Sequence, residues 1–214
     1  MNKESQIIKQ QVVYEGKWIK VLKKDFSIGD KVIKDYECVE RNKSDKDFKE
    51  FDGVSMAPIL YNTPTGIKQI IIIAQFRPPT GKFLLEFPAG LVESDNLFEN
   101  AERELKEETG YHMDKQSQIE ELSFPNIPIS VDDPGLCSGS GKFIIVKVDY
   151  KDIRNQKVTQ ELDEAENIRV HLINLDNQLV NKLIQLAESN GYWISTKLYT
   201  FAAGFCFSQV ASKF

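Results

Sequence analysis

Residues 103–111 read RELKEETGY, and the acids in this stretch decide the interpretation of the chain. Apolar residues recur at every fourth position, at Leu97, Ala101 and Leu105. This spacing predicts a helix over 97–108 with one face directed toward a core.

The ends and charges of this helix can also be assigned. Asp95 or Asn96 can cap its start, and Gly110 can supply the left-handed residue that ends it. Opposite charges at helical spacing predict three ion pairs. These pairs are Glu99–Arg103, Glu102–Lys106 and Arg103–Glu107.

Glu104 and Glu108 are left without a helical partner, and they share one face. Like charges at this spacing cost about 0.2–0.5 kcal/mol, and an acid near the C-terminal end of a helix costs about 0.3–1 kcal/mol. Penalties of this size are typical of a solvent-exposed face. However, a Pro-Ala-Gly turn at 88–90 leads into the helix and can place a backbone carbonyl beside the two acids. Oxygen ligands of this kind suit Mg²⁺, so the context favours a metal site.

The composition limits the class of protein. With 214 residues and a formal net charge of −5, the chain can form one full domain plus a small element, and it lacks the basic surface that tracks nucleic acid. The three cysteines, Cys38, Cys137 and Cys206, fit neither a disulfide framework nor metal-ligand spacing. The most apolar run, residues 70–74, is too short to cross a bilayer. We therefore expect a soluble intracellular protein that binds neither membrane nor nucleic acid, in the cytoplasm, with the nucleus as an alternative.

The first part of the chain is predicted to be β structure. Residues 17–28 and 31–41 are rich in β-forming residues, and Gly29-Asp30 between them indicates a hairpin turn. The polar run 42–53 is the one plausible internal boundary. We predict a small antiparallel β domain over 1–50, followed by a second domain over 51–214.

The second domain mixes strands and helices. Residues 53–62 and 67–77 are strand candidates, and the run of isoleucines in the second indicates a central strand covered on both faces. Further strands are expected over 141–150 and 167–175, and helices over 176–189 and 195–210. The prediction is an α/β sandwich with a mixed sheet.

Residues 90–111 resemble the Nudix box, Gly-x5-Glu-x7-Arg-Glu-U-x-Glu-Glu-x-Gly-U, where U is a bulky apolar residue. RELKEETGY matches every specified position of the second half. The first half departs from the pattern, because the residue eight positions before Arg103 is Asp95 rather than Glu, and the loop after Gly90 is one residue short. Glu93 is an alternative for that acid.

The resemblance extends over nearly the whole chain. EGKWIKV (15–21), YECVER (36–41), AQFRPPTGKFLLEFPAGL (74–91) and DDPGL (132–136) are similar to the eukaryotic ADP-sugar pyrophosphatase branch of the Nudix hydrolases. This resemblance implies an α/β/α sandwich and a homodimer whose N-terminal β domains are exchanged and contribute substrate contacts. It also implies Mg²⁺-dependent hydrolysis of ADP-ribose to AMP and ribose 5-phosphate, with Mn²⁺ as an alternative metal.

The resemblance also implies roles for individual residues. Metal ligands would be Glu104, Glu108 and the Ala89 carbonyl, with Glu107 close by and Arg103 orienting the acids. Substrate contacts would be Trp18 and Tyr36 stacking on adenine, Glu37 and Arg41 on base or phosphate, Arg77 on the diphosphate, the Leu91 backbone, and Asp133. Other interpretations stay open for four of them: Trp18 as a core residue, Arg41 and Arg77 as surface ion-pair partners, and Asp133 as a turn residue.

Diphosphate hydrolysis also needs a carboxylate that accepts a proton from the attacking water. In this branch the acid often comes from a loop far downstream, and ELDEAENIRV (161–170) is the acidic loop placed suitably. The resemblance favours Glu166 as the base and as a further metal ligand, with Glu164 as second choice. Glu107 is the alternative base. The loop can also be a solvated linker without a catalytic role. Two other functions remain: hydrolysis of oxidised nucleoside diphosphates such as 8-oxo-dGDP, and a non-catalytic module that senses ADP-ribose.

Overall fold

The chain divides into two units in the computed structural model, which describes residues 4–42, 50–114 and 127–211. The first unit is Met1–Asp52 together with Pro128–Lys142, and the second is Gly53–Ile127 together with Phe143–Phe214. The segment Pro128–Lys142, expected in the second domain, groups instead with the N-terminal strands. Most of the polar run at the expected boundary, residues 43–49, lies outside the described residues.

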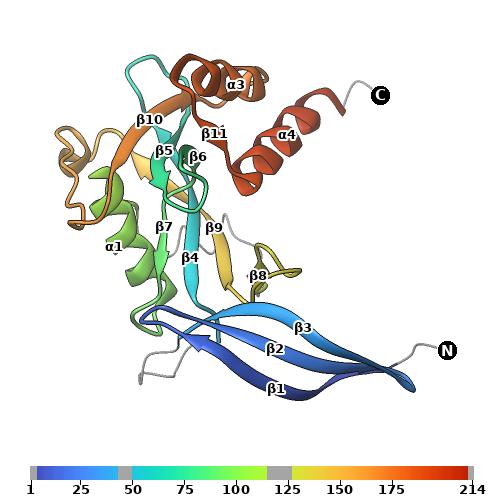
Figure 1. Ribbon diagram of the computed structural model, residues 1–214. Coiled ribbons are helices and arrows are strands. Elements are labelled where there is room, and N and C mark those ends of the chain that lie inside the picture. The colour runs from blue at the N-terminus through green and yellow to red at the C-terminus, as the bar shows by residue number, and fades with distance from the viewer. Residues whose placement is uncertain (1–3, 43–49, 115–126, 212–214) are drawn as a thin grey trace. The chain divides into compact units, whose positions relative to one another are not determined.

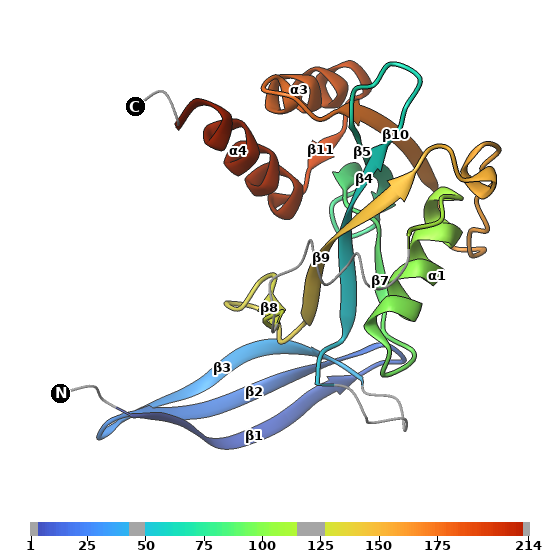
Figure 2. The same ribbon diagram turned by 180° about the vertical axis from the view of Figure 1, so that it is seen from behind.

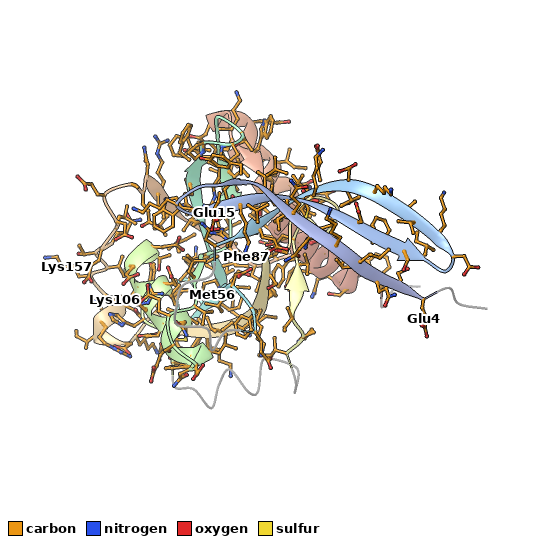
Figure 3. The ribbon with its side chains drawn as sticks, turned by 60° about the horizontal axis from the view of Figure 1, so that its bottom comes forward. Glu4, Glu15, Met56, Phe87, Lys106 and Lys157 are labelled. Atoms are coloured by element: carbon orange, nitrogen blue, oxygen red, sulfur yellow. The ribbon has the colours of Figure 1, made fainter. Side chains whose placement is uncertain are left out.

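The first unit is built on a three-stranded antiparallel sheet. Its strands are β1 (Ser5–Glu15), β2 (Ile19–Ile28) and β3 (Lys31–Arg41), in that order. The expected hairpin at Gly29 is present, and Gly29 adopts the left-handed conformation with φ of 59°. Figure 3 labels Glu4 and Glu15 at the two ends of β1 and shows side chains standing out on both sides of the three strands.

The second segment of this unit packs on β3. A two-residue strand, β8 (Ser130–Val131), pairs with the first residues of β9 (Ser140–Asp149). Between them, the Leu136 carbonyl accepts a hydrogen bond from the Val39 N–H at 2.9 Å, and Ser138 donates to the Val39 carbonyl at 3.2 Å. These bonds extend the β structure beyond β3.

The second unit contains a mixed sheet. Its strands are β4 (Gly53–Tyr61), β5 (Gln69–Arg77), β6 (Lys82–Glu86), β7 (Ala89–Leu91), β9, β10 (Ile168–Asn174) and β11 (Trp193–Ile194). The order is β11-β6-β5-β4-β9, with β10 paired to β5 and β7 paired to β4. β11 is parallel to β6, whereas β5 is antiparallel to β4, β6 and β10.

Helices cover both faces of this sheet. In Figure 1, α1 (Leu97–Thr109) lies on one side of the sheet, and α3 (Leu179–Asn190) and α4 (Thr196–Ala211) lie on the other; Figure 2 shows the same layers from behind. Ile70 and Ile72 of β5 pack into the cluster that contains Leu183 and Leu198. Residues 70–73 are all fully buried, so the central strand and the α/β sandwich are confirmed.

The structure corrects one local expectation. The Pro-Ala-Gly segment is not a tight turn: residues Ala89–Leu91 form the short strand β7, which runs antiparallel to the start of β4. The N–H of Met56 donates to the Pro88 carbonyl at 3.0 Å. Met56 and Phe87, both labelled in Figure 3, are buried in the second unit. Because pairing satisfies the backbone of this segment, the chain stays extended until it enters the loop before α1.

A short 3-10 turn, η1 (Ile153–Asn155), completes the regular structure. Among the described residues, none of the helices is both long enough and apolar enough to cross a membrane.

Candidate functional site

The acid-bearing helix α1 has well-defined ends. The side chain of Asn96, not Asp95, caps it by accepting hydrogen bonds from the N–H groups of Phe98 and Glu99. At the other end Gly110 has φ of 76° and donates to the Lys106 carbonyl at 2.8 Å. The predicted helix is therefore correct to within one residue.

Two of the three ion pairs expected within α1 are wrong. Arg103 does pair with Glu107 at 2.8 Å, but it also contacts Glu104 at 2.7 Å instead of Glu99. Glu102 contacts the His112 ring at 2.9 Å. Its partner in the prediction, Lys106, pairs with Glu161 at 2.8 Å. Glu102 and Lys106 thus find partners outside the helix, at His112 and Glu161, instead of pairing with each other.

The acids left over by the helical pairing, Glu104 and Glu108, are buried. Their exposed fractions are 8% and 2%, so the solvent-exposed interpretation of this face is wrong. The Ala89 N–H donates to Glu108 Oε2 at 2.9 Å. The carboxylate of Glu104 packs directly on the backbone of Gly90, where an ideal Cβ would meet its carboxyl carbon at 1.8 Å. β7 therefore positions both acids of the helix.

Burial makes ionisation of these two acids unfavourable. The pKa of Glu108 is raised to about 8, mainly by burial. The nearby carboxylates of Glu104 and Glu166 contribute to this rise, whereas the Ala89 N–H and Arg77 oppose it. The pKa of Glu104 is also raised, mainly by burial, although Arg103 partly offsets this. Two buried acids that resist ionisation would be stabilised as carboxylates by a cation between them.

The ligand set can be compared with what a metal needs. Among the described residues, no group of three or more His, Cys, Asp or Glu side chains is arranged to hold a metal ion. Glu104 and Glu108 are two hard oxygen ligands, and Mg²⁺ is commonly bound by one or two carboxylates, with waters and substrate phosphates completing the shell. The residues present therefore fit a hard divalent cation of this kind.

Arg103 links the acids to the loop before the helix. Besides Glu104 and Glu107, its guanidinium donates to the Leu91 carbonyl at 3.0 Å. The contacts with both acids are those that an orienting arginine would make. The Leu91 carbonyl is thus already engaged, and only the rest of its backbone is available to a substrate.

Arg77 is held by an acid that the sequence analysis did not single out. Its guanidinium contacts Glu86 through Nε at 3.2 Å to both carboxylate oxygens and through Nη2 at 2.6 Å. Arg77 also lies close enough to Glu108 and Glu166 for their charges to raise its pKa, although burial opposes this. Arg77 therefore combines an ion pair with a position beside the acid cluster. In the register of β5 and β6, Arg77 lies opposite Lys82 and Glu86 lies opposite Ile73, so the spacing in the sequence does not predict this contact.

The loop that follows η1 brings Glu166 to the same cluster. The Glu166 carboxylate is close enough to raise the pKa of both Glu104 and Glu108. One of its oxygens accepts a hydrogen bond from the Asp163 N–H at 3.0 Å. Glu164 is exposed. Glu107 is engaged with Arg103.

The shortened entry to α1 is organised by Asn100, which the sequence analysis missed. This residue is buried, and its side-chain oxygen accepts hydrogen bonds from the N–H groups of Glu93 and Ser94 at 2.7 and 3.2 Å. Glu93 lies 3.9 Å from the Arg103 Nε, whereas Asp95 is exposed. A buried amide on the core side of the helix could have signalled this role. Asn100 thus holds the loop through the backbone N–H groups of Glu93 and Ser94.

The adenine-stacking candidates belong to the first unit. Trp18 has 68% of its surface exposed, so the alternative of a core tryptophan is wrong. Tyr36 is also exposed; its ring packs edge-on against Phe26 and its hydroxyl donates to the Gly135 carbonyl at 2.6 Å. Glu37 makes a long contact of 3.9 Å with Lys23. Arg41 is exposed.

Asp133 fulfils the role of a turn residue. Its backbone carbonyl accepts hydrogen bonds from Leu136 and Cys137 at 3.1 and 2.9 Å. This turn brings Gly135 to the Tyr36 hydroxyl. The carboxylate of Asp133 remains a candidate for substrate contact.

Known proteins resemble this chain in sequence and fold. It is 32% identical over 206 residues to the putative Nudix hydrolase 2 of Caenorhabditis elegans, an alignment that covers 96% of this chain and 87% of the relative. It is 30% identical over 197 residues to the ADP-sugar pyrophosphatase of Mus musculus, covering 91% and 84%. A crystal structure titled ADP compounds hydrolase superposes with a TM-score of 0.61 at 15% identity, covering 100% of this chain and 97% of that one, and this likeness concerns the fold alone. Residues 53–188 match the NUDIX domain family, and the chain therefore belongs to that family.

Proposed function

We propose that this protein is a hydrolase that cleaves the diphosphate bond of ADP-ribose and related ADP-sugars to AMP and a sugar phosphate, using Mg²⁺ or alternatively Mn²⁺. The observation that carries the proposal is the burial of Glu104 and Glu108 on one face of α1, beside Arg77 and Glu166. The ADP-sugar pyrophosphatase of the mouse, which aligns along most of this chain, supports the substrate class.

The metal is supported by the chemistry of the acids. Hydrolases of this family generally need a divalent metal ion. Glu104, Glu108 and Glu166 would hold it, with the Ala89 carbonyl as a backbone ligand. A bound divalent cation would neutralise charge on the diphosphate and lower the pKa of water. Because the pKa values of the two helix acids are raised, proton release should accompany metal binding.

Other residues would orient and activate the reactants. Arg77, fixed by Glu86, would bind the diphosphate through its remaining N–H groups, and Arg103 would hold Glu104 in place. Glu166 would accept the proton of the attacking water. We prefer it to Glu107, because the Glu107 carboxylate is already engaged by Arg103 at 2.8 Å.

The first unit would supply the adenine site. The exposed rings of Trp18 and Tyr36 are available for stacking, and Glu37, Arg41, Leu91 and Asp133 would make further substrate contacts. The unit would also form a homodimer by exchange of its sheet. Every residue of β1 is exposed, including Ile7, Ile8, Val12 and Val13. Exposed apolar side chains on this scale are typical of a surface that is covered in an assembly.

A substrate panel tests the proposal. Purified protein would be assayed with Mg²⁺ and with Mn²⁺ for release of AMP from ADP-ribose and ADP-mannose, and for hydrolysis of 8-oxo-dGDP. We expect AMP from ADP-ribose, and its loss in the Glu104→Gln variant. Binding of ADP-ribose without release of AMP would instead identify a sensing module. Faster hydrolysis of 8-oxo-dGDP would favour the oxidised-nucleotide function.

A further inference from the structure

The last turn of α1 is fastened to the loop before β10. A helix leaves its final four carbonyls without helical partners. Here the Glu107 carbonyl accepts a hydrogen bond from the Glu161 N–H at 2.8 Å, and the Glu108 carbonyl accepts one from the side-chain amide of Gln160 at 2.6 Å. The C-terminus of the acid-bearing helix is therefore completed by a segment about fifty residues downstream.

The same Gln160 amide also reaches the far end of that loop. Its Nε2 lies 3.3 Å from the carbonyl oxygen of Ile168, the first residue of β10. An amide nitrogen carries two hydrogens, so Gln160 can donate to Glu108 and Ile168 together. One side chain thus closes the loop 160–168 on itself and attaches it to the helix.

Glu166 lies inside this closed loop, two residues before Ile168. A local turn fixes it, because Glu166 N–H donates to the Asp163 carbonyl at 2.9 Å and Asp163 N–H donates to the Glu166 carboxylate at 3.0 Å. These bonds define the shape of the loop but not its distance from α1. Between the loop and the helix, the hydrogen bonds of Gln160 and Glu161 hold that distance, while β5 holds the end of the loop through Asn167 and Ile168.

Glu108 is consequently held at two points. β7 binds its carboxylate through the Ala89 N–H, and Gln160 binds its backbone carbonyl. We propose that Gln160 is a positioning residue that sets Glu166 relative to Glu108 and so aligns the acid of the loop with the acids of the helix. This inference rests on the proposed function, in which Glu166 acts on the attacking water.

The other contacts between loop and helix hold only the start of the loop, as the backbone bond from Glu161 to Glu107 does. The Lys106–Glu161 pair is exposed to solvent, and pairs of this kind contribute little. Gly110 packs tightly against Thr159, since an ideal Cβ on Gly110 would lie 2.6 Å from the Thr159 nitrogen. That contact fixes residue 159, which precedes the loop. The strand after Glu166 is held by β5, because Ile168 pairs with Gln75 and the Phe76 N–H donates to the Asn167 carbonyl at 3.3 Å. Gln160 is the side chain that joins this strand to the helix.

The direct test replaces Gln160 by methionine, which has similar length but no N–H. We expect kcat for ADP-ribose to fall roughly 10- to 100-fold, the effect typical of a lost supporting hydrogen bond at a reactive group, while KM changes less than about twofold. The split follows because Gln160 positions a catalytic group and contacts none of the proposed substrate residues. A rise in KM with unchanged kcat would overturn the inference.

Gln156→Met is the matched control. Gln156 lies four residues before Gln160, and its amide also donates to a backbone carbonyl, that of Tyr150, rather than to the helix or β10. Its loss should leave kcat and KM unchanged. An equal fall of kcat in both variants would show that any lost amide bond in this region has the same effect, which contradicts a specific role of Gln160.

A double-mutant cycle identifies the group through which Gln160 acts. In a Glu166→Gln background, Gln160→Met should cause no further loss of kcat, because the group to be positioned has been removed. Independent, multiplying losses would overturn the inference, as would full activity of Glu166→Gln alone. A wild-type protein that releases no AMP would contradict the proposed function itself, which separates the two failures.

Hydrogen exchange of the metal-free protein provides a readout besides activity. In the wild type, the Glu161 amide should exchange as slowly as amides in the last turn of α1, since it donates to Glu107. In Gln160→Met the Glu161 and Glu166 amides should exchange faster, while those of β5 stay protected. If Gln160→Met fails to fold, Gln160→Asn keeps an amide that is one methylene too short and should show the same changes. Unprotected Glu161 in the wild type would overturn the inference without any variant.

Discussion

The carboxylate of Glu104 occupies the space where a side chain on Gly90 would begin. An ideal Cβ on Gly90 would lie 1.8 Å from the carboxyl carbon of Glu104 and 1.9 and 2.1 Å from its two oxygens. A glycine is thus required here by close approach rather than by an unusual backbone angle. The strand β7 and the helix α1 can meet only with a bare backbone at this position.

Replacing Gly90 by alanine should therefore displace the Glu104 side chain. We expect kcat for AMP release to fall at least about tenfold, because a displacement of the order of 1 Å at a reactive centre can cost about 100-fold. Overpacking should also lower the free energy of unfolding by about 1–3 kcal/mol. Steady-state assays and thermal melts measure both effects.

Gly204→Ala provides the control for this variant. Gly204 lies inside α4, and an added Cβ there would meet nothing within 4 Å. The change should leave activity unaltered and stabilise the protein by about 0.4–1 kcal/mol. Full activity of Gly90→Ala would show that Glu104 need not remain where the structure has it.

A second prediction concerns the pH dependence of stability. The pKa of Glu108 is raised from 4.5 to about 8, mainly by burial. At low pH the Glu108 side chain is protonated and neutral in both the folded and the unfolded protein, so its burial does not lower the free energy of unfolding. The metal-free protein should therefore lose stability progressively as pH rises from about 4.5 to about 8, since each unit of pKa difference corresponds to about 1.4 kcal/mol.

Glu108→Gln removes this charge. We expect the metal-free variant to be more stable than the wild type at pH 9, on the order of a few kcal/mol, and similar to it at pH 4. Metal-dependent release of AMP should be lost. Thermal melts in a chelator at the two pH values make the comparison. A variant that is less stable than the wild type at pH 9 would contradict the electrostatic explanation.

The sequence predicted those features that depend on local pattern. Periodicity of apolar residues and the preferences of turn residues were sufficient for three of them. These are the helix that ends at Gly110, the buried isoleucines of β5 and the hairpin at Gly29. Local pattern did not predict the partners of the charged residues. Glu102 turns to His112 because residues beyond the helix fold back on it, and helical spacing contains no information about that contact.

The same limit applies to the candidate site. Glu104 and Glu108 could be singled out because their motif lies within one helix. Glu86 and Gln160 could not, since each acts on a residue brought near by strand pairing or by loop closure. The strand β7 was also missed, because three residues show no periodicity and their extended form depends on β4.

A third prediction separates recognition from stability at Trp18. Because 68% of its surface is exposed, Trp18→Ala should leave the free energy of unfolding unchanged to within about 0.5 kcal/mol. KM for ADP-ribose should rise, with an expected cost of about 1–3 kcal/mol for one lost stacking ring. Trp193→Ala, which removes a ring with 55% exposed surface from the second unit, should change neither quantity. Unchanged KM in Trp18→Ala would remove this residue from the adenine site.

The last prediction concerns assembly. Ile8 and Val13 of β1 expose 53% and 55% of their surface, although a sheet of three strands gains stability chiefly by covering its apolar side chains. If a second copy of the chain covers Ile8 and Val13, a lysine at either position would have to lose its water on dimerisation. The apolar contact of the original side chain would also be lost. Ile8→Lys and Val13→Lys, made separately, should therefore shift the molar mass measured by light scattering from dimer toward monomer as the protein is diluted. Ile153→Lys changes a residue with 82% exposed surface in the second unit and should leave the mass unchanged. A wild-type protein that is monomeric at the highest concentration tested would contradict the proposed exchange of N-terminal sheets. A dimer that persists in both β1 variants would show that copies associate through another surface.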